Sequence, residues 1–380
     1  MIYLDNSATT YPKPKEVIDA VMDSFVKFGA NPGRSGHSFS IKTALKIAEI
    51  RENLAQFVGA ENMENVIFTS GATESLNLAI LGSVVKGGHI VVTENDHNSV
   101  LRPVFYLKKL GLVEVSVAKA KHNNKLTAQD ILSCIKPNTY LICINHISNV
   151  DGMIADIEEI GKICYEKCIL LLVDGAQSVG HQNIDIVRQH IDFLAIAGHK
   201  GLYAPQGVGV LVVSSKAKLK PIKFGGTGTD SFSVEQPKEK PEAFESGTLA
   251  TPAIIGLGAG LEFVKKNFVK IKDKLEDLTT CLHYELSQIK NLKIYTHPDN
   301  ANGVLSFNIG NMQSTEVAQI LDNEFNIMVR SGLHCAPLKH RALGTLETGT
   351  VRVSMSYHTT YNDISKLIKA VKIISAKEKV

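Results

Sequence analysis

Residues 169–177 read ILLLVDGAQ, and this stretch decides the fold. Its apolar run is far shorter than the ~20 residues that a membrane-spanning helix needs. It has instead the length of a strand that is buried on both faces. Asp174 follows directly and therefore lies at the carboxyl end of the predicted strand. Parallel α/β sheets bind their ligands at that edge, so the stretch predicts a parallel sheet with Asp174 at a ligand site.

Short β-rich runs of the same kind recur on both sides of this stretch. They lie at residues 66–69, 90–93, 113–117, 140–145, 193–197 and 208–213. Helical patterns lie between most of them, at residues 74–85, 99–110, 128–135 and 157–166, and before them at 14–28 and up to Gly59. Thr127 and Asp130 form the acidic variant of a helix-start box. Strands that alternate with helices predict an α/β fold with a large, mostly parallel sheet covered on both faces.

The pattern changes near residue 254. A long helical stretch runs from there to about residue 290, and it is followed by strands at 304–309 and 351–355 and helices at 315–324 and 363–374. This predicts a smaller α+β domain. We therefore expect a large α/β domain over residues 14–253 and a small one over residues 254–380 together with residues 1–13. Residues 224–247, rich in Gly, Ser, Pro and charge, are predicted to be a long surface excursion.

Composition narrows the class of protein. The chain has 380 residues, with 41 Lys and Arg against 38 Asp and Glu, and a net charge this close to zero is no nucleic-acid signature. A hydrophobic content of 44% excludes a disordered chain. Six irregularly spaced Cys favour a reduced compartment over a disulfide framework, and no second Cys/His pair completes a metal site. The N-terminus lacks the basic and apolar regions of a signal peptide. We expect a cytoplasmic protein without metal, membrane or nucleic-acid partners.

A Lys follows the next strand along the chain. Lys200, in the segment GHKG (residues 198–201), comes 26 residues after Asp174. Pyridoxal phosphate requires such a pair, because a Lys attaches to its aldehyde and an Asp keeps its pyridine nitrogen protonated. On these two residues alone, a loop-capping Asp174 and a solvated Lys200 remain an equal alternative.

Other strand ends carry polar residues as well. The segment TSGATE (residues 69–74) follows a strand and opens a helix, where free backbone N–H groups suit a phosphate. His97 and Asn149 follow two further strands. Taken singly, each is more often a cap or a surface residue. Together, five strand ends that offer Thr, His, Asn, Asp and Lys favour one shared ligand site.

This set resembles class V of the fold-type I pyridoxal-phosphate enzymes, the family of the cysteine desulfurases and selenocysteine lyases. The resemblance extends from Tyr3 to Arg352 and implies a pyridoxal 5'-phosphate cofactor. The resemblance implies that Lys200 holds the cofactor and acts as acid and base. It further implies that Asp174 pairs with the pyridine nitrogen, Gln177 binds the phenolic oxygen and His97 stacks on the ring. The implied phosphate ligands are Ala72, Thr73 and His199, together with Thr248 from a second subunit. Ala197 stands where the family usually has a Ser.

Residues 330–337 read RSGLHCAP and contain Cys335. A free Cys is most often a buried structural residue, but this one lies among Gly, His and Pro. The segment resembles the Arg-x-Gly-x-His-Cys-Ala motif of the group II, or Suf-type, desulfurases, with Leu333 in place of a common His. Arg352 follows Cys335 by only 17 residues, as in the short loop of that group. In the family Arg352 would bind the substrate carboxylate, a task suited to its planar fork. Asn149 and His37 would also contact substrate.

The resemblance implies a cysteine desulfurase that converts L-cysteine to L-alanine and leaves a persulfide on Cys335. The alternative is a selenocysteine lyase, which would not need Cys335. An aminotransferase or a kynureninase-like hydrolase is less favoured, and a sulfur-relay scaffold that docks through residues 224–247 is a further hypothesis. A homodimer and a sulfur-acceptor protein of unknown identity are the implied partners. His334, the substrate or the Gly-rich loop could activate Cys335.

Overall fold

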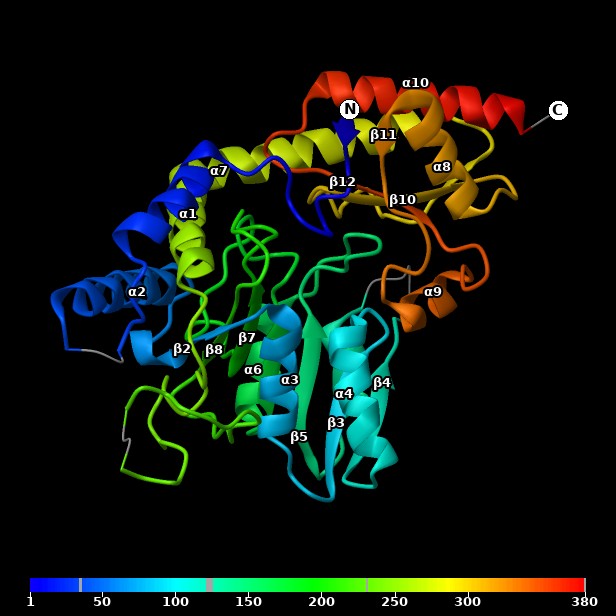
Figure 1. The fold of residues 1–380 in the computed structure, drawn as a ribbon. Coiled ribbons are helices and arrows are strands. Elements are labelled where there is room, and N and C mark those ends of the chain that lie inside the picture. The colour runs from blue at the N-terminus through cyan, green and yellow to red at the C-terminus, as the bar shows by residue number, and fades with distance from the viewer. Residues whose placement is uncertain (34–35, 121–125, 230–231, 379–380) are drawn as a thin grey trace.

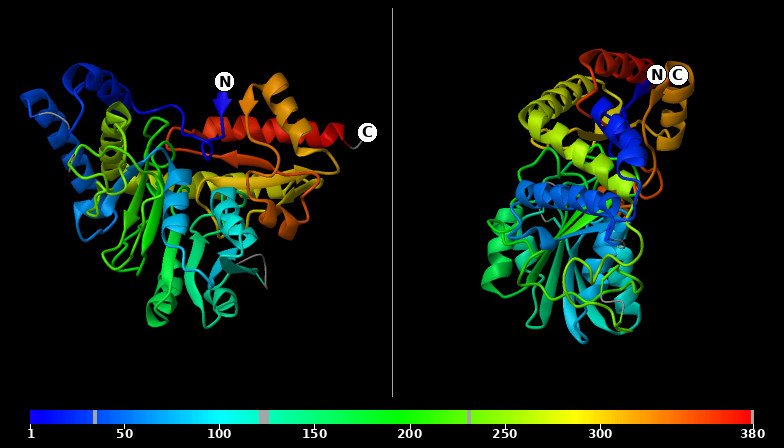
Figure 2. Two further views of the ribbon diagram at one scale, coloured as in Figure 1. Left: turned by 60° about the horizontal axis from the view of Figure 1, so that its bottom comes forward. Right: turned by 60° about the vertical axis from the view of Figure 1, so that its left-hand side comes forward.

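The protein is built around one seven-stranded sheet with helices on both faces (Figures 1 and 2). The computed structural model describes residues 1–33, 36–120, 126–229 and 232–378. The strand order is β2-β8-β7-β6-β5-β3-β4. The strands are β2 (Val66–Thr69), β3 (Gly88–Thr93), β4 (Val113–Ala118), β5 (Thr139–Asn145), β6 (Leu170–Asp174), β7 (Phe193–Ala197) and β8 (Gly209–Val213).

The prediction of a mostly parallel sheet is confirmed. Strands β4, β3, β5, β6 and β7 are parallel along the sheet, whereas β8 is antiparallel to both of its neighbours. The connection between β7 and β8 carries Lys200 and contains no helix. Parallel strands need a crossover of about a dozen or more residues, usually helical, so this short connection favours the antiparallel return.

Successive residues of the central strands pack against different helices. Leu172 of β6 belongs to a buried cluster with residues of α3 (Ala72–Gly82) and α4 (Asn98–Lys109). Its neighbours Leu171 and Val173 belong to the cluster on the other face, which includes α6 (Ile157–Glu166). This two-residue alternation makes the strands apolar throughout, as the sequence predicts.

The remaining elements form a second layer above the sheet in Figure 1. A three-stranded antiparallel sheet has the order β12-β10-β9, and β1 pairs in parallel with β11. The strands are β1 (Ile2–Tyr3), β9 (Leu292–Ile294), β10 (Val304–Ile309), β11 (Ile327–Met328) and β12 (Val351–Ser354). The helices are α7 (Thr251–Ser287), α8 (Ser314–Phe325), α9 (Pro337–Leu343) and α10 (Tyr361–Lys377). The N-terminal segment therefore reaches the C-terminal part of the chain through β1.

Helix α7 spans both parts of the molecule. It packs against α1 (Lys15–Lys27) and α2 (Ser38–Phe57) near its beginning and against α10, β9 and β10 further along (Figure 1). It begins at Thr251, earlier than the predicted start, because Pro252 suits the first turn of a helix.

Most predicted elements are confirmed, with shifted ends. Helix α6 and strand β10 have the predicted bounds, and Thr127 and Asp130 form the predicted capping box of α5 (Ala128–Leu132). Helix α5 ends at Leu132, earlier than predicted. Helix α3 ends at Gly82, where an added Cβ would lie 2.5 Å from the Lys220 carbonyl oxygen. In the part of the chain that the structure describes, no helix combines the length and apolar content needed to cross a bilayer.

Candidate active site

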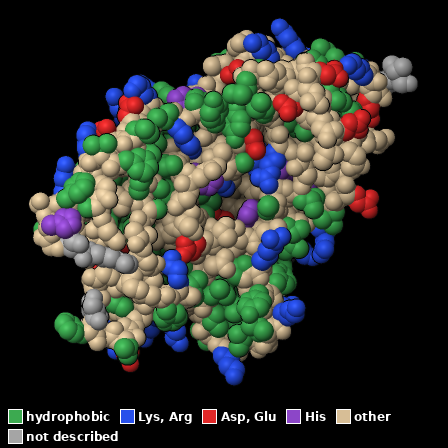
Figure 3. Space-filling model, in the orientation of Figure 1, with side chains coloured by type: hydrophobic (Ala, Val, Ile, Leu, Met, Phe, Trp, Pro, Cys, Tyr) green, Lys and Arg blue, Asp and Glu red, His purple; other side chains and the backbone are tan. Residues whose placement is uncertain are grey.

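The carboxyl ends of β5, β6 and β7 and the N-terminal ends of α3 and α4 surround one cavity of about 280 Å³. The space-filling view is hollowed between the two layers, where His, Lys and Arg side chains gather (Figure 3). The cavity brings together eight of the predicted site residues, namely Ala72, Thr73, His97, Asn149, Asp174, Gln177, His199 and Lys200. These residues come from five separate strand ends, so the sheet edge predicted from residues 169–177 is the edge where they converge.

Lys200 and Asp174 both line the cavity and interact electrostatically. Burial lowers the pKa of Lys200 to about 8, partly offset by Asp174 and reinforced by the cations Arg352 and Arg330. Burial raises the pKa of Asp174, while the Ala176 N–H, 3.0 Å from Oδ1, and Lys200 oppose that shift. A lysine that loses its proton near neutral pH is suited to nucleophilic and acid–base work.

The N-terminal turn of α3 lies at the cavity wall. The first N–H groups of any helix have no acceptor within the helix, so this turn offers donors to an anion. Gly209 of β8 lets the turn approach closely, because an added Cβ there would lie 2.5 Å from the Gly71 backbone. Thr73 Oγ1 lies 2.9 Å from Ser99 Oγ, which links this turn to α4.

His97 caps α4 and is neutral. Its Nδ1 accepts a hydrogen bond from the Ser99 N–H at 3.0 Å, which places the ring proton on Nε2. Burial and, to a smaller extent, the cations Lys200, Arg330, Arg352 and Arg102 together lower the pKa of His97 to about 4. A neutral ring fixed by its own helix cap can present a flat face to a ligand.

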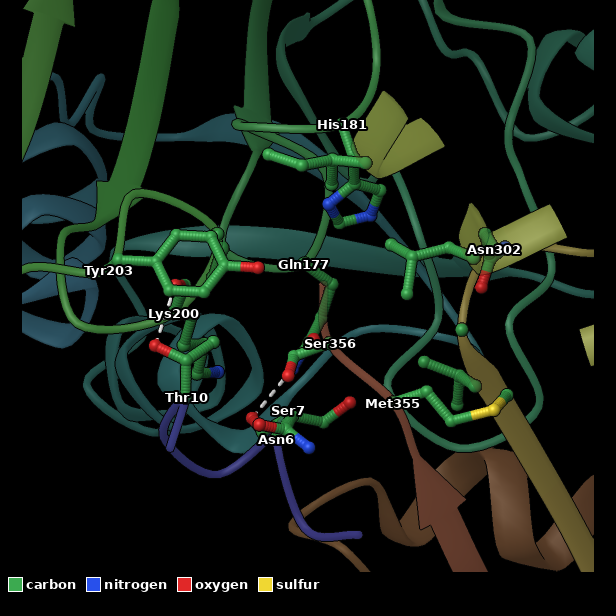
Figure 4. Close-up of a pocket in the computed structure, with 16 residues that line it drawn as sticks. Asn6, Ser7, Thr10, Gln177, His181, Lys200, Tyr203, Asn302, Met355 and Ser356 are labelled. Atoms are coloured by element: carbon green, nitrogen blue, oxygen red, sulfur yellow. Dashed lines mark hydrogen bonds between the residues drawn. The ribbon is translucent and has the colours of Figure 1, made fainter. Parts of the chain in front are cut away.

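A second, smaller pocket of about 40 Å³ lies beside the cavity and shares Lys200, Gln177 and Ala176 with it. His181, Tyr203, Asn302 and Met355 converge on it from different elements (Figure 4). The Gln177 amide donates to the Ser7 carbonyl oxygen at 3.0 Å, and the Thr10 hydroxyl donates to the Lys200 carbonyl oxygen at 3.1 Å. The N-terminal segment therefore holds the side chain of Gln177 and the backbone of Lys200.

Arg352 lies on β12 and points to the cavity region from the second layer. Its Nη1 donates to the Asn149 carbonyl oxygen at 3.0 Å, and its Nη2 lies 2.6 Å from Asp5 Oδ1. Its buried Nε has no hydrogen-bond partner among the described residues, and neither has Asn149 Oδ1. Buried polar atoms are nearly always paired, so these two mark a place for a ligand.

Cys335 lies next to the cavity rather than inside it. Its carbonyl oxygen accepts from the N–H of Asn98, the residue after His97, at 2.7 Å. The Asn149 amide donates to the neighbouring His334 carbonyl oxygen at 2.7 Å. Both His334 and Cys335 have positive φ, 47° and 59°, a conformation that non-glycine residues adopt only when the surroundings impose it.

Of the three activators that the sequence left open for Cys335, the structure disfavours His334. Its Nε2 lies 3.1 Å from the Thr350 carbonyl oxygen, so it carries the ring proton. Burial lowers the pKa of His334 to about 2, with Arg352, His340 and Arg330 adding to the shift, and so weak a base takes up protons poorly. Arg330, which the sequence analysis did not single out, places Nη2 3.9 Å from the Cys335 sulfur.

Two predicted site residues lie away from this chain's own cavity. His37 caps α2, where its Nδ1 accepts from the Ser40 N–H at 3.2 Å. Thr248 is exposed and does not line the cavity. In one subunit the structure therefore does not bring either residue to the other eight.

Sequence reasoning assigned no role to three charged residues of the site, Asp5, Arg330 and Asp96, although Arg330 opens the segment that contains Cys335. Asp96 is fully buried behind His97 and accepts from the Thr93 and Asn145 N–H groups at 2.6 and 2.9 Å. Burial raises its pKa to about 8, and nearby Asp174 adds to that shift. The sequence places Asp96 directly before His97 and Asp5 in the N-terminal segment that resembles the family. It does not reveal which residues they contact, because those residues lie far away along the chain.

No metal cluster emerges from the described ranges, which hold no group of three or more His, Cys, Asp or Glu side chains arranged for an ion.

The chain is similar to known proteins over nearly its whole length. The model of the aminotransferase class-V family matches residues 2–367. A probable cysteine desulfurase of Methanothermobacter thermautotrophicus is 37% identical, and the match covers 96% of this chain and 92% of the relative. A cysteine desulfurase of Yersinia pseudotuberculosis is 31% identical, and the match covers 98% of this chain and 93% of the relative. Among solved structures, the apo structure of a cysteine desulfurase from Thermococcus onnurineus matches with a TM-score of 0.93 and 32% identity over 99% of this chain and 95% of that one. The chain belongs to the aminotransferase class-V family.

Proposed function

We propose that this protein is a pyridoxal-phosphate-dependent cysteine desulfurase. It converts L-cysteine to L-alanine and transfers the substrate sulfur to Cys335. In this reaction the Cβ–S bond of cysteine breaks, Cβ gains a hydrogen, and a persulfide forms in place of the Cys335 thiol. The observation that carries the proposal is that Lys200 and Asp174 face one cavity while the Cys335 backbone is hydrogen-bonded to the residue after His97. The desulfurase relatives support it.

The residues of the cavity fit pyridoxal phosphate. When bound, this cofactor withdraws electrons from the Cα of an amino acid. Asp174 would pair with its ring nitrogen, His97 would cover its ring, Gln177 would bind its phenolic oxygen, and Ala72, Thr73 and His199 would bind its phosphate. The unpaired Nδ1 of His199 and the open N-terminal turn of α3 are the donors and acceptors that such a group would satisfy. Ala197 leaves this phosphate site one hydroxyl short of the family pattern.

The chain's own side chains perform the other tasks. Lys200, whose pKa is about 8, removes the Cα proton and returns it at the end of the reaction. Arg352 holds the substrate carboxylate through its unpaired Nε, and the unpaired Oδ1 of Asn149 accepts a hydrogen bond from a donor group of the substrate. Cys335 attacks the substrate sulfur as a thiolate, a step of nucleophilic catalysis, and Arg330 is the cation beside it. No observation in the described part of the chain singles out L-selenocysteine as the substrate.

A homodimer would complete the site. The exposed face of α1 carries an apolar stripe, Ile18, Met22, Phe25 and Val26, that is 52 to 79% exposed. Contiguous apolar surface of this kind typically marks an interface. A second copy would bury the stripe and bring Thr248 to the phosphate site and His37 to the substrate.

We also propose that the chain is divided into two domains, one of residues 14–253 and one of residues 254–380 together with 1–13, of which 379–380 lie outside the described residues. A sulfur-acceptor protein would then unload Cys335.

The test is alanine release from L-cysteine by the Cys335→Ala and Lys200→Ala variants. Replacing Cys335 removes the sulfur acceptor, so we expect turnover to fall by about 100-fold or more. Replacing Lys200 removes the attachment point, so borohydride should no longer fix the cofactor to this position. Undiminished turnover without Cys335 would reject its role. A purified protein without yellow colour that binds an acceptor tightly would favour the scaffold hypothesis.

A further inference from the structure

We propose that Lys339 is a positioning residue for Cys335, because its buried ion pair with Asp151 holds the Cys335 segment in place beside the cavity. The inference rests on the proposed function, since it concerns the sulfur step of that reaction. Neither Lys339 nor Asp151 lines the cavity. Each acts through the backbone that connects it to a nearby site residue, Cys335 in one case and Asn149 in the other.

The ion pair joins the two segments that meet at the active site. Lys339 lies in α9, four residues after Cys335, and Asp151 lies two residues after Asn149 in the connection from β5 to α6. Lys339 Nζ lies 2.7 Å from Asp151 Oδ2, and the two side chains are 1% and 3% exposed. The ion pair therefore connects the two layers of the molecule close to the Cys335 thiol.

Stability does not explain this pair. Both charged side chains are buried, and apart from its ion pair with Asp151 the Lys339 ammonium has no hydrogen-bond partner among the described residues. The adjoining small cluster, Val150, Ala336 and Leu343, is apolar and would accept an apolar pair. A buried ion pair with incomplete hydrogen bonding contributes little net stability, while it fixes the relative position of its partners.

The Asp151 end is a rigid anchor. Residues 148–153 form a compact turn in which the Gly152 N–H donates to the Ser148 carbonyl oxygen at 3.0 Å. Gly152 has φ of +69°, and its carbonyl oxygen accepts from the Asn302 amide. An added Cβ at Gly152 would lie 2.9 Å from Asn302 Oδ1 and 3.0 Å from the Val304 carbonyl oxygen, so a larger residue there would strain the turn.

The Cys335 end needs such an anchor. His334 and Cys335 adopt left-handed backbone conformations that are unfavourable for these residue types. Their backbone is held from one side by Asn98 and Asn149. Lys339 holds the same segment from its other end, through the short helix α9. With both ends fixed, the sulfur stays next to the cavity without a swing of the loop.

The test compares two reactions of the same holoenzyme. Alanine release from L-cysteine needs the Cys335 sulfur, whereas exchange of the Cα hydrogen of L-alanine in D₂O needs Lys200 and the cofactor but no thiol. We expect Lys339→Met to lower kcat for alanine release by about 10- to 100-fold, since a misplacement of about 1 Å can cost that much. The exchange rate with L-alanine should stay at the wild-type value.

The double variant Lys339→Met/Asp151→Asn distinguishes loss of the tether on Cys335 from the cost of leaving the Asp151 carboxylate buried without a partner. It removes the lone buried carboxylate, so its melting temperature should recover while kcat for alanine release stays low. Amide hydrogen exchange of residues 333–343 should be faster than in the wild type in both variants. Arg341→Met, an exposed change in the same helix, is the matched control and should behave as the wild type.

Three results would overturn the inference. These are a wild-type kcat in Lys339→Met, recovery of kcat together with stability in the double variant, and an equal loss of both reactions in the folded double variant. Failure of the wild type to release alanine would instead reject the proposed function, and the amide exchange of residues 333–343 would still test the tether.

Discussion

At the scale of single residues, the guanidinium of Arg352, the proposed carboxylate-binding group, is held in one orientation by residues of the chain itself. Asp5 holds Nη2 at 2.6 Å and the Asn149 carbonyl oxygen holds Nη1 at 3.0 Å, which leaves Nε free. Burial lowers the pKa of Arg352 and Asp5 opposes that shift, so the carboxylate also favours the charged form. Asp5 is in this sense part of the candidate carboxylate site.

The variant Asp5→Asn tests this orientation. Loss of the charged partner should raise KM for L-cysteine about tenfold, which corresponds to about 1.4 kcal/mol, while kcat changes less. Steady-state kinetics over a range of L-cysteine concentrations measures both constants. Asp19→Asn, on the exposed surface of α1, is the control. An unchanged KM would mean that Asp5 has no part in substrate binding.

The pKa of Lys200 leads to a second prediction. Its value of about 8, below the ordinary 10.5, means that the amine is uncharged above about pH 8 instead of only above pH 10.5. Capture of pyridoxal phosphate by the cofactor-free protein requires the uncharged amine. Its rate should therefore rise with pH and level off just above pH 8. Stopped-flow absorbance at a series of pH values gives this profile, and a rise that continues to pH 10 would contradict it.

The residues of the cavity could be predicted from the sequence because each follows a recognisable strand. Their partners could not. Asp5 and Arg352 are 347 positions apart, and Lys339 and Asp151 are 188 apart, so only the folded chain brings them together. Local patterns carry information about period and turns, not about which distant charges meet.

At the scale of elements, prediction succeeds where a strand or helix is long and periodic. Helix α6 and strand β10 were predicted with their observed bounds. Strands β1 and β11 were not, because two residues each show no periodicity and depend on each other for pairing. Helix α9 was also missed, since its seven residues are too few for an apolar stripe.

The close approach of β8 to the start of α3 yields a third prediction. Gly209→Ala would place a Cβ 2.5 Å from the Gly71 backbone and push the first turn of α3 away from the cavity. We expect weaker retention of pyridoxal phosphate, measured by its absorbance after dialysis. Gly36→Ala is the matched control, because an added Cβ there meets no atom of the described residues within 4 Å. Equal retention in both variants would show that this turn does not hold the phosphate.

At the scale of the whole molecule, the exposed stripe on α1 predicts assembly. Phe25 is 64% exposed at its centre. Phe25→Glu would place a charge in the proposed interface, so we expect sedimentation to shift from dimer to monomer and the cofactor to be lost more readily. Lys27→Glu, at the last residue of the same helix, changes charge without removing apolar surface and is the control. A monomeric wild type would contradict the proposal.

Helix α7 has a consequence for how the protein melts. Its 37 residues, about 55 Å along the helix axis, pack against α1 and α2 in one part of the molecule and against α10, β9 and β10 in the other. We expect that heating cannot unfold one part while the other stays intact, because the loss of either part exposes apolar surface of the same helix. A calorimeter should record a single endotherm, although chains of this length commonly show several transitions.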